Sequence, residues 1–163
     1  RHEMSANGLE VFDKTLETTH IWLNEIMKDL GPDRQVAWKV LSTVLHKLRD
    51  RLPIGLAAHL GAQLPLLVRG VYYDQFEPGK LPAECSSREE FVGEVAEWLA
   101  DTRPVDPDAA VRSVFGVLSR HVSEGQIAKV RDALPKSLRQ SWPAGEAPAA
   151  KPETLVLTEA QEV

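Results

Sequence analysis

The chain has 163 residues, of which 43% are hydrophobic and 26% charged, with a formal net charge of -5 and a single cysteine, Cys85. This length suits one globular domain or two small repeats that share a core. One cysteine excludes a disulfide framework within the chain and a zinc site built from cysteines, and it suits a reducing compartment. No apolar run reaches the ~20 residues of a membrane-spanning helix and no signal peptide is recognisable, so we expect a cytoplasmic protein.

The first half of the chain predicts four helices. Residues 9–30, apart from one gap, and residues 36–52 carry apolar side chains every three or four positions, which is typical of amphipathic helices. A break with proline follows each run. Residues 56–64 predict a short third helix. Pro65 suits the first turn of a fourth helix that extends toward residue 76, because the N–H that proline lacks has no helical partner there.

The second half begins after a loop predicted over residues 77–87. Ser87 and Glu90 have the spacing of a capping box for the next helix, and Asp106 before Pro107 is the expected start of another. No segment alternates apolar and polar residues over the length of a strand. The sequence therefore predicts an all-α fold.

The two halves resemble each other. Residues 40–72 overlay on residues 110–142 at a shift of 70 positions without a gap, and the shift matches the Leu-Pro pair that ends at Pro65 to the pair that ends at Pro135. Two amphipathic helical runs can overlay by chance, but the matching prolines favour a true repeat. We therefore predict two related four-helix repeats.

These patterns divide the chain into one all-helical domain with two flanking segments. The domain covers residues 8–143: repeat one (8–76), linker (77–87) and repeat two (88–143). Arg1–Glu3 are expected to be an expression remnant ahead of Met4, and residues 1–7 a flexible N-terminus. Residues 144–163 begin rich in Ala, Pro and Gly and predict a disordered tail. Its small apolar cluster, Thr154–Thr158, is either a docking peptide or a frayed end.

Charge alternates along the chain. Residues 10–33 carry -4, residues 34–71 carry +5, residues 74–101 carry -6 and residues 103–142 carry +3, and the tail adds -3. Either acidic helices lie beside basic neighbours inside the molecule, or the basic helices of both halves form one anion-binding surface.

The second interpretation predicts a basic interaction surface, formed by Lys47, Arg49, Arg51, Arg69, Arg120, Arg131 and Arg139. An acidic protein or an anionic metabolite would bind there. Nucleic acid is not expected, because the chain is acidic (pI about 5.6) and has no nucleic-acid-binding motif.

An aromatic group is the second candidate site. Tyr72 and Tyr73 lie at the end of the fourth predicted helix, and Trp142 ends its counterpart in the second half. These rings either fill the core or line a groove between the repeats that binds a small apolar or anionic ligand.

Signatures of enzyme chemistry are missing from the sequence. It contains no phosphate-binding loop, dinucleotide-binding turn, zinc-protease motif or nucleophile elbow. His46 and His59 fall on neighbouring predicted helices, but a metal site needs at least one more ligand. We expect no enzyme, no catalytic residue, no cofactor and no metal.

Several runs resemble the bacterial family called "domain of unknown function 2267". They are Arg51–Pro53, Ala62–Tyr72, Arg120–Gly125 and Asp132–Pro135, ahead of Trp142–Pro143. The Leu-Pro pair after a short helix, present in both halves, is the most specific, and the resemblance covers about residues 8–143. It implies an all-helical domain with two related halves in a soluble bacterial protein, and it implies no activity, cofactor or catalytic residue.

We therefore expect a non-enzymatic protein-interaction or adaptor module that uses the basic surface. Its partner is an unidentified protein, and a homodimer is one assembly compatible with the sequence. The alternative is a helical bundle that binds a small apolar or anionic ligand between the two repeats.

Overall fold

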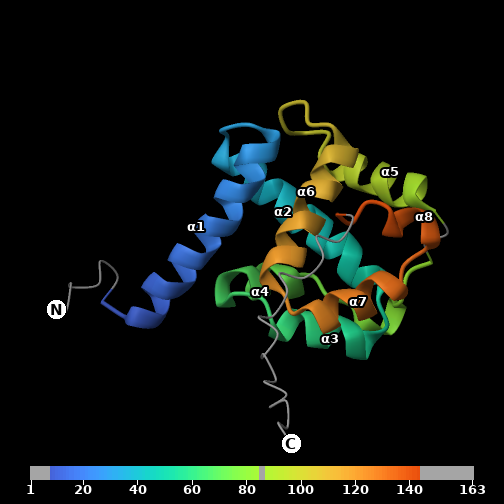
Figure 1. Cartoon of the computed structure of the whole chain (residues 1–163), viewed down its shortest axis with the longest axis horizontal. Helices are drawn as coiled ribbons and strands as arrows, with labels where there is room; N and C mark the ends of the chain where they lie inside the picture. Colours follow the sequence, from blue (N-terminus) through green and yellow to red (C-terminus); the bar gives the residue numbers. More distant parts are fainter. Residues whose placement is uncertain (1–7, 85–86, 144–163) are drawn as a thin grey trace, which may run out of the picture.

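The computed structural model describes residues 8–84 and 87–143, which form eight α-helices, one 3-10 turn and no strand (Figure 1). The helices are α1 (Glu10–Leu30), α2 (Arg34–Arg51), α3 (Ile54–Ala62), α4 (Leu66–Tyr73), α5 (Arg88–Trp98), α6 (Pro107–His121), α7 (Glu124–Asp132) and α8 (Lys136–Arg139), and the 3-10 turn is Pro78–Lys80. The predicted all-α fold is confirmed. Cys85, the predicted flexible N-terminus and the predicted tail lie outside the described residues.

Two helices begin at the capping residues that the sequence predicts. The Ser87 hydroxyl accepts a hydrogen bond from the Glu90 N–H, and the Asp106 carboxylate accepts one from the Asp108 N–H, with Pro107 at the first helical position. Each bond satisfies an N–H that has no partner within its helix. The predicted caps at Ser87 and Asp106 are thus confirmed.

The start of α4 differs slightly from the prediction. Pro65 is the residue before the helix rather than part of its first turn, and its carbonyl oxygen accepts a hydrogen bond from the Arg69 N–H (2.7 Å). The helix ends at Tyr73, short of Phe76, because the chain becomes extended at Asp74.

Helices α2 and α6 lie side by side at the centre of the fold (Figure 1). Helix α1 packs on α2 and α6, helix α5 packs on the same two helices, and α3 contacts α7. The fully buried side chains of the central pair include Val40, Val44, Leu48, Val114 and Phe115. This apolar contact joins the first four helices to the last four in one core.

The packing is similar in the two halves. Helix α1 packs on α2 of its own half and α6 of the other, whereas α5 packs on α6 of its own half and α2 of the other. Helices α3 and α7 are both nine residues long, and each precedes a Leu-Pro pair with an extended proline. The two-repeat interpretation stays a prediction, which these matched features support.

None of the helices in the described ranges is both long enough and apolar enough to cross a lipid bilayer.

Candidate functional site

Arg49, predicted to lie on the basic surface, is a structural residue. Its side chain is only 3% exposed. The guanidinium donates hydrogen bonds to the carbonyl oxygens of Tyr72 (2.6 Å) and Asp74 (2.8 Å) and to the Asp50 carboxylate (2.9 Å). These carbonyls end α4, so Arg49 fixes that end of α4 on α2 and is not available to a partner.

Arg51 is also withdrawn from the surface. It is buried, its guanidinium pairs with Glu94 of α5, and it lies 5.8 Å from the centre of the Phe91 ring. Lys47, one turn earlier, lies over the half-exposed ring of Trp98 at 4.7 Å. Burial and the nearby Arg51 charge lower the pKa of Lys47, so this lysine loses its proton at a lower pH than an exposed lysine does.

Arg69 and Arg139 make matching contacts at the ends of two short helices. The Arg69 guanidinium donates to the carbonyl oxygens of Gly61 and Ala62, the last residues of α3, and of Leu64 after it, at 2.9 to 3.0 Å. The Arg139 guanidinium donates to those of Arg131 and Asp132, the last residues of α7, and of Leu134 after it, at 2.8 to 3.1 Å. Both arginines therefore satisfy carbonyls that have no partner within their helix.

The structure does not place the seven predicted residues on one solvent-facing surface. The guanidinium groups of Arg49, Arg51, Arg69 and Arg139 are bound within the molecule, because buried carbonyls and carboxylates need such donors. Arg120 is exposed and pairs with Glu25, and Arg131 is half-buried. Binding of an acidic partner by the remaining groups stays a prediction.

The predicted aromatic residues mostly fill the core. Tyr72 is fully buried and its hydroxyl donates to the Ala57 carbonyl oxygen (2.6 Å), and burial raises its pKa. Trp142 is buried and stacks on Phe115, with ring centres 4.1 Å apart. Tyr73 is half-buried beside Tyr72. Large rings at helix ends have filled core space, so Tyr72 and Trp142 do not line a common groove.

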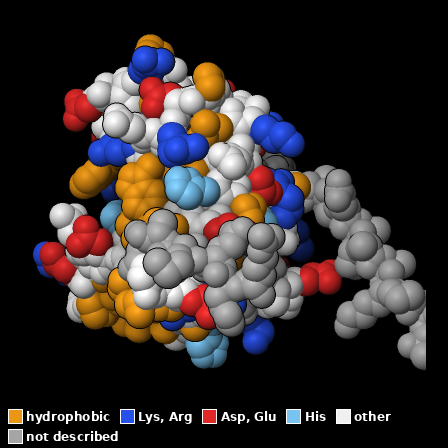
Figure 2. Space-filling model, turned by 90° about the vertical axis from the view of Figure 1, so that its left-hand side faces the viewer, with side chains coloured by type: hydrophobic (Ala, Val, Ile, Leu, Met, Phe, Trp, Pro, Cys, Tyr) orange, Lys and Arg blue, Asp and Glu red, His pale blue; other side chains and the backbone are white. Residues whose placement is uncertain are grey.

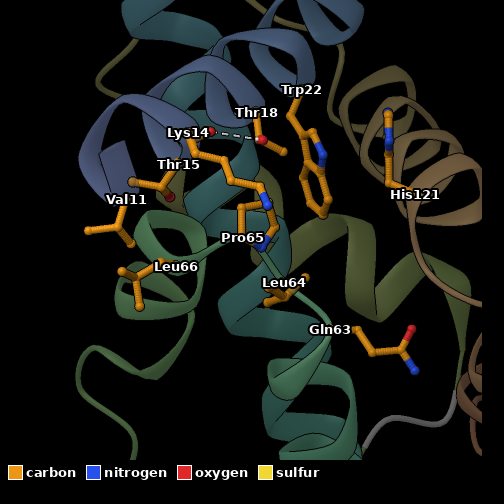
Figure 3. A pocket seen from close by; sticks show the side chains of 10 residues that line it. All are labelled: Val11, Lys14, Thr15, Thr18, Trp22, Gln63, Leu64, Pro65, Leu66 and His121. Carbon is orange, nitrogen blue, oxygen red and sulfur yellow. Dashed lines mark hydrogen bonds between the residues drawn. The ribbon is translucent and has the colours of Figure 1, made fainter. Parts of the chain in front are cut away.

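A different site is open to solvent between α1 and α4. A cavity of about 330 Å³ lies there (Figure 3), and most of its wall is apolar. Its ten lining residues include no carboxylate and are Val11, Lys14, Thr15, Thr18, Trp22, Gln63, Leu64, Pro65, Leu66 and His121. We call this site the α1/α4 groove.

Local structure places the groove residues. Val11, Thr15, Thr18 and Trp22 are spaced by three or four positions, so they share one face of α1. The Thr15 hydroxyl accepts a hydrogen bond from the Leu67 N–H (3.0 Å), which holds the start of α4 against that face. The extended Pro65 then leaves the Leu66 side chain at the rim.

Large apolar side chains are exposed at this rim. Val11 and Leu66 are each 52% exposed, and Leu67 is 39% exposed. Figure 2 views the side of the molecule on which α1 lies, and hydrophobic, histidine, basic and acidic side chains are mixed on that face. Apolar side chains that gather around a cavity are typical of a binding surface rather than of scattered surface residues.

Donor groups line the inner end of the groove. Trp22 is 1% exposed and its indole N–H has no hydrogen-bond partner, while its ring stacks on His121 at 5.3 Å between centres. Lys14 extends across the groove toward Pro65 (Figure 3). An ammonium and an unpaired indole N–H suit a ligand with acidic groups or carbonyl oxygens.

An ion-pair cluster adjoins the groove and links α1 to α6. The Glu25 carboxylate receives hydrogen bonds from the Arg120 guanidinium and from Nε2 of His121. Burial opposes ionisation of Glu25, but these hydrogen bonds and the charges of His121 and Arg120 outweigh it and hold its pKa below the usual value. The cluster fixes the His121 ring against Trp22 and thereby shapes the inner wall.

A second cavity, of about 480 Å³, lies on the other side of this cluster. Its wall includes Asp29, Arg112, Arg120, Trp142 and Pro143. Arg112 and Arg120 already pair with carboxylates of the chain, and the hydroxyl of Ser113, another wall residue, donates to Asp29 (2.7 Å). The charged groups of this wall are thus paired within the chain, whereas the indole N–H of Trp142, like that of Trp22, has no hydrogen-bond partner.

Metal ligation has no candidate among the described residues, where no three His, Cys, Asp or Glu side chains gather. Nε2 of His46, weighed as a ligand from the sequence, instead donates to the Val71 carbonyl oxygen (2.6 Å), and His59 is exposed.

Comparison with protein families identifies a family for this chain. The model of the family described as an uncharacterized conserved protein (DUF2267) matches residues 19–141. The chain belongs to the DUF2267 family. The DUF2267 match covers Trp22, Glu25, Leu66 and His121 but begins after Val11 and Lys14, so part of the groove wall lies outside it. No curated protein matches the chain.

The sequence-based search missed the groove. Val11 and Leu66 have the spacing of ordinary apolar helix positions, and only their exposure in the fold sets them apart. The sequence does contain one signal. Leu66 and Leu67 are consecutive leucines directly after Pro65, and two neighbouring positions of a short helix do not both face the protein core.

Proposed function

We propose that this DUF2267 protein is a protein-interaction module that binds an apolar peptide segment of its partner in the α1/α4 groove. The exposure of Val11 and Leu66, which line a cavity, carries this proposal, and the neighbouring Leu67 is exposed as well. Burying these side chains under a partner would remove apolar surface from water, which is the main favourable term in protein association.

The donors of the groove suggest the chemistry of the bound segment. Lys14 favours an acidic residue beside the apolar side chains, and the unpaired Trp22 N–H favours a carbonyl oxygen. An extended or helical segment with two or three apolar residues and a flanking Glu or Asp has both features. The proposal keeps the predicted interaction role but moves it from the basic surface to an apolar groove.

A binding experiment with one matched control tests this proposal. Leu66→Asp puts a carboxylate at the rim, at the first position of α4, where the helix dipole favours it, so the fold should be retained. Ile54→Asp makes the same change at the first position of α3, where Ile54 is 46% exposed and outside the groove.

Fluorescence anisotropy with a panel of labelled apolar-acidic peptides is the measurement. At least one peptide should bind the wild-type chain, and Leu66→Asp should weaken it at least tenfold, because removal of one buried leucine contact costs about 1.5 kcal/mol or more. Ile54→Asp should bind like the wild type. Equal loss in both variants, or binding unaffected by Leu66→Asp, would contradict the proposal.

A small ligand is the second candidate, and the Trp22 N–H favours it. A ligand with an apolar body and a carboxylate would fill the cavity, pair with Lys14 and accept from this buried donor. Titration of medium-chain fatty acids against tryptophan fluorescence tests it: saturable quenching that is lost in Trp22→Phe supports a small-ligand site. The non-enzymatic role, the cytoplasmic location and a homodimer stay predictions.

A further inference from the structure

The end of the described chain lies close to the α1/α4 groove. Pro143 is in the wall of the second cavity, together with Asp29 near the end of α1. Arg120 belongs to that cavity and His121 to the α1/α4 groove, and both bind Glu25. The two cavities are therefore adjacent, on either side of one ion-pair cluster.

The residues that follow Pro143 have the chemistry that the groove favours. Leu155, Val156 and Leu157 are three consecutive large apolar residues, and Glu153 and Glu159 flank the cluster. The segment from residue 143 onward carries a net charge of -3, whereas the groove carries Lys14 and has no carboxylate in its wall. The apolar residues of this segment and its negative charge both match the proposed occupant of the groove.

The connecting chain is long enough. From Asp29 to Val11, helix α1 spans about 27 Å at its rise of about 1.5 Å per residue. The stretch from Ala144 to Thr154 spans up to about 35 Å when extended, at roughly 3.3 Å per residue. Leu155–Leu157 can thus reach the groove from Pro143.

We propose that Thr154–Thr158 of this chain binds in its own α1/α4 groove and competes there with the partner's segment. This inference rests on the proposed function, because it assigns a regulator to the same site. A tethered segment has an effective concentration of about 1 mM, so a segment whose own dissociation constant as a free peptide is about 100 μM weakens a competing peptide about tenfold. The partner must then displace the segment, which sets a threshold for binding.

The test uses the full chain and two variants of the tail. Leu155→Asp with Leu157→Asp removes the apolar cluster, and Ala149→Asp with Ala150→Asp adds the same charge but leaves the cluster intact. The probe is a labelled synthetic peptide of residues 151–163, followed by fluorescence anisotropy. It should bind the first variant about tenfold more tightly than the wild type and the second variant like the wild type.

A third chain completes the design. Leu66→Asp combined with Leu155→Asp and Leu157→Asp should lose the gain in affinity, because the gain depends on the groove. If the probe binds the wild type and the tail variant equally while Leu66→Asp still weakens foreign peptides, the tail inference fails and the proposed function stands. If no peptide binds any chain, both fail.

Sedimentation velocity separates binding within one molecule from binding between two. We expect the wild-type chain and the Leu155→Asp, Leu157→Asp variant to sediment alike at all concentrations. A wild-type dimer that is lost in the variant would place the segment in the groove of a second copy and would overturn binding within one chain.

Discussion

Two regions of this protein differ in which kind of side chain they bury. Where α2 meets α4 and α5, Arg49 and Arg51 are buried, whereas between α1 and the start of α4, Val11 and Leu66 are exposed. A buried arginine whose guanidinium bonds carbonyls and carboxylates of the same chain is structural, because those buried groups need its hydrogen bonds. Exposed apolar side chains beside a cavity have no partner in the fold, so they are the better guide to function.

The two halves of the chain also differ at one matched position. Arg69 and Arg139 make the same hydrogen bonds at the ends of α3 and α7, but the position that matches Arg49 at a shift of 70 holds Ser119. The hydroxyl of Ser119 only donates to the Phe115 carbonyl oxygen, one turn earlier in its own helix. The halves thus share how their short helices end, and they differ in how the last helix is attached.

The largest expected effect is that of replacing Arg49, the buried arginine of the first comparison. Arg49→Ala removes this donor from the Tyr72 and Asp74 carbonyls and leaves a cavity beside them. Loss of a buried charged partner costs about 3 kcal/mol or more. Urea unfolding followed by circular dichroism measures the free energy of unfolding. Arg112→Ala, which removes an exposed arginine paired with Asp108, is the control and should cost less than about 1 kcal/mol. A loss below 1 kcal/mol for Arg49→Ala would show that this arginine is not structural.

The next prediction sharpens the comparison of the two halves. Arg69→Ala and Arg139→Ala each remove a half-buried guanidinium from three carbonyl oxygens, so each should lower the free energy of unfolding by about 1–2 kcal/mol. The same urea titrations compare them, and the two losses should agree within about 0.5 kcal/mol. A loss confined to one variant would mean that the matching geometry does not reflect matching energetics.

Much of the fold was predictable because its signals are local. Helical spacing of apolar residues, the Ser87 and Asp106 caps and the proline breaks act over a few residues, so the sequence predicts where most helices start and end. The end of α4 was less predictable, since Arg49, which lies far away in the sequence, binds the carbonyls of Tyr72 and Asp74.

The site was not predictable for a related reason. Charge counts along the chain cannot distinguish an arginine on the surface from one whose partners come from another helix, as for Arg51 and Glu94. Likewise, the spacing of Val11 and Leu66 is that of core residues, and their exposure depends on how far α1 extends past α4. Both features depend on packing between helices rather than on local sequence.

The smallest expected effect concerns the cluster that separates the two cavities. The pKa of Glu25 is lowered in the folded protein, so its ionised form stabilises the fold at pH values above its ordinary pKa of 4.5, and this stabilisation is lost as the pH falls through the lowered value. Glu25→Gln should therefore lower the melting temperature by about 3 °C at pH 7, equivalent to about 1 kcal/mol, and by much less near pH 3.

Thermal melts at the two pH values, with Glu17→Gln on the same helix as the control, check this prediction. Glu17 is exposed, and its neutralisation should leave the melting temperature unchanged at both pH values. Because the Glu25 cluster holds His121 against Trp22, the substitution should also alter tryptophan fluorescence at pH 7. A destabilisation of equal size at pH 7 and pH 3 would mean that Glu25 acts through packing, and the wall between the two cavities would then not depend on its charge.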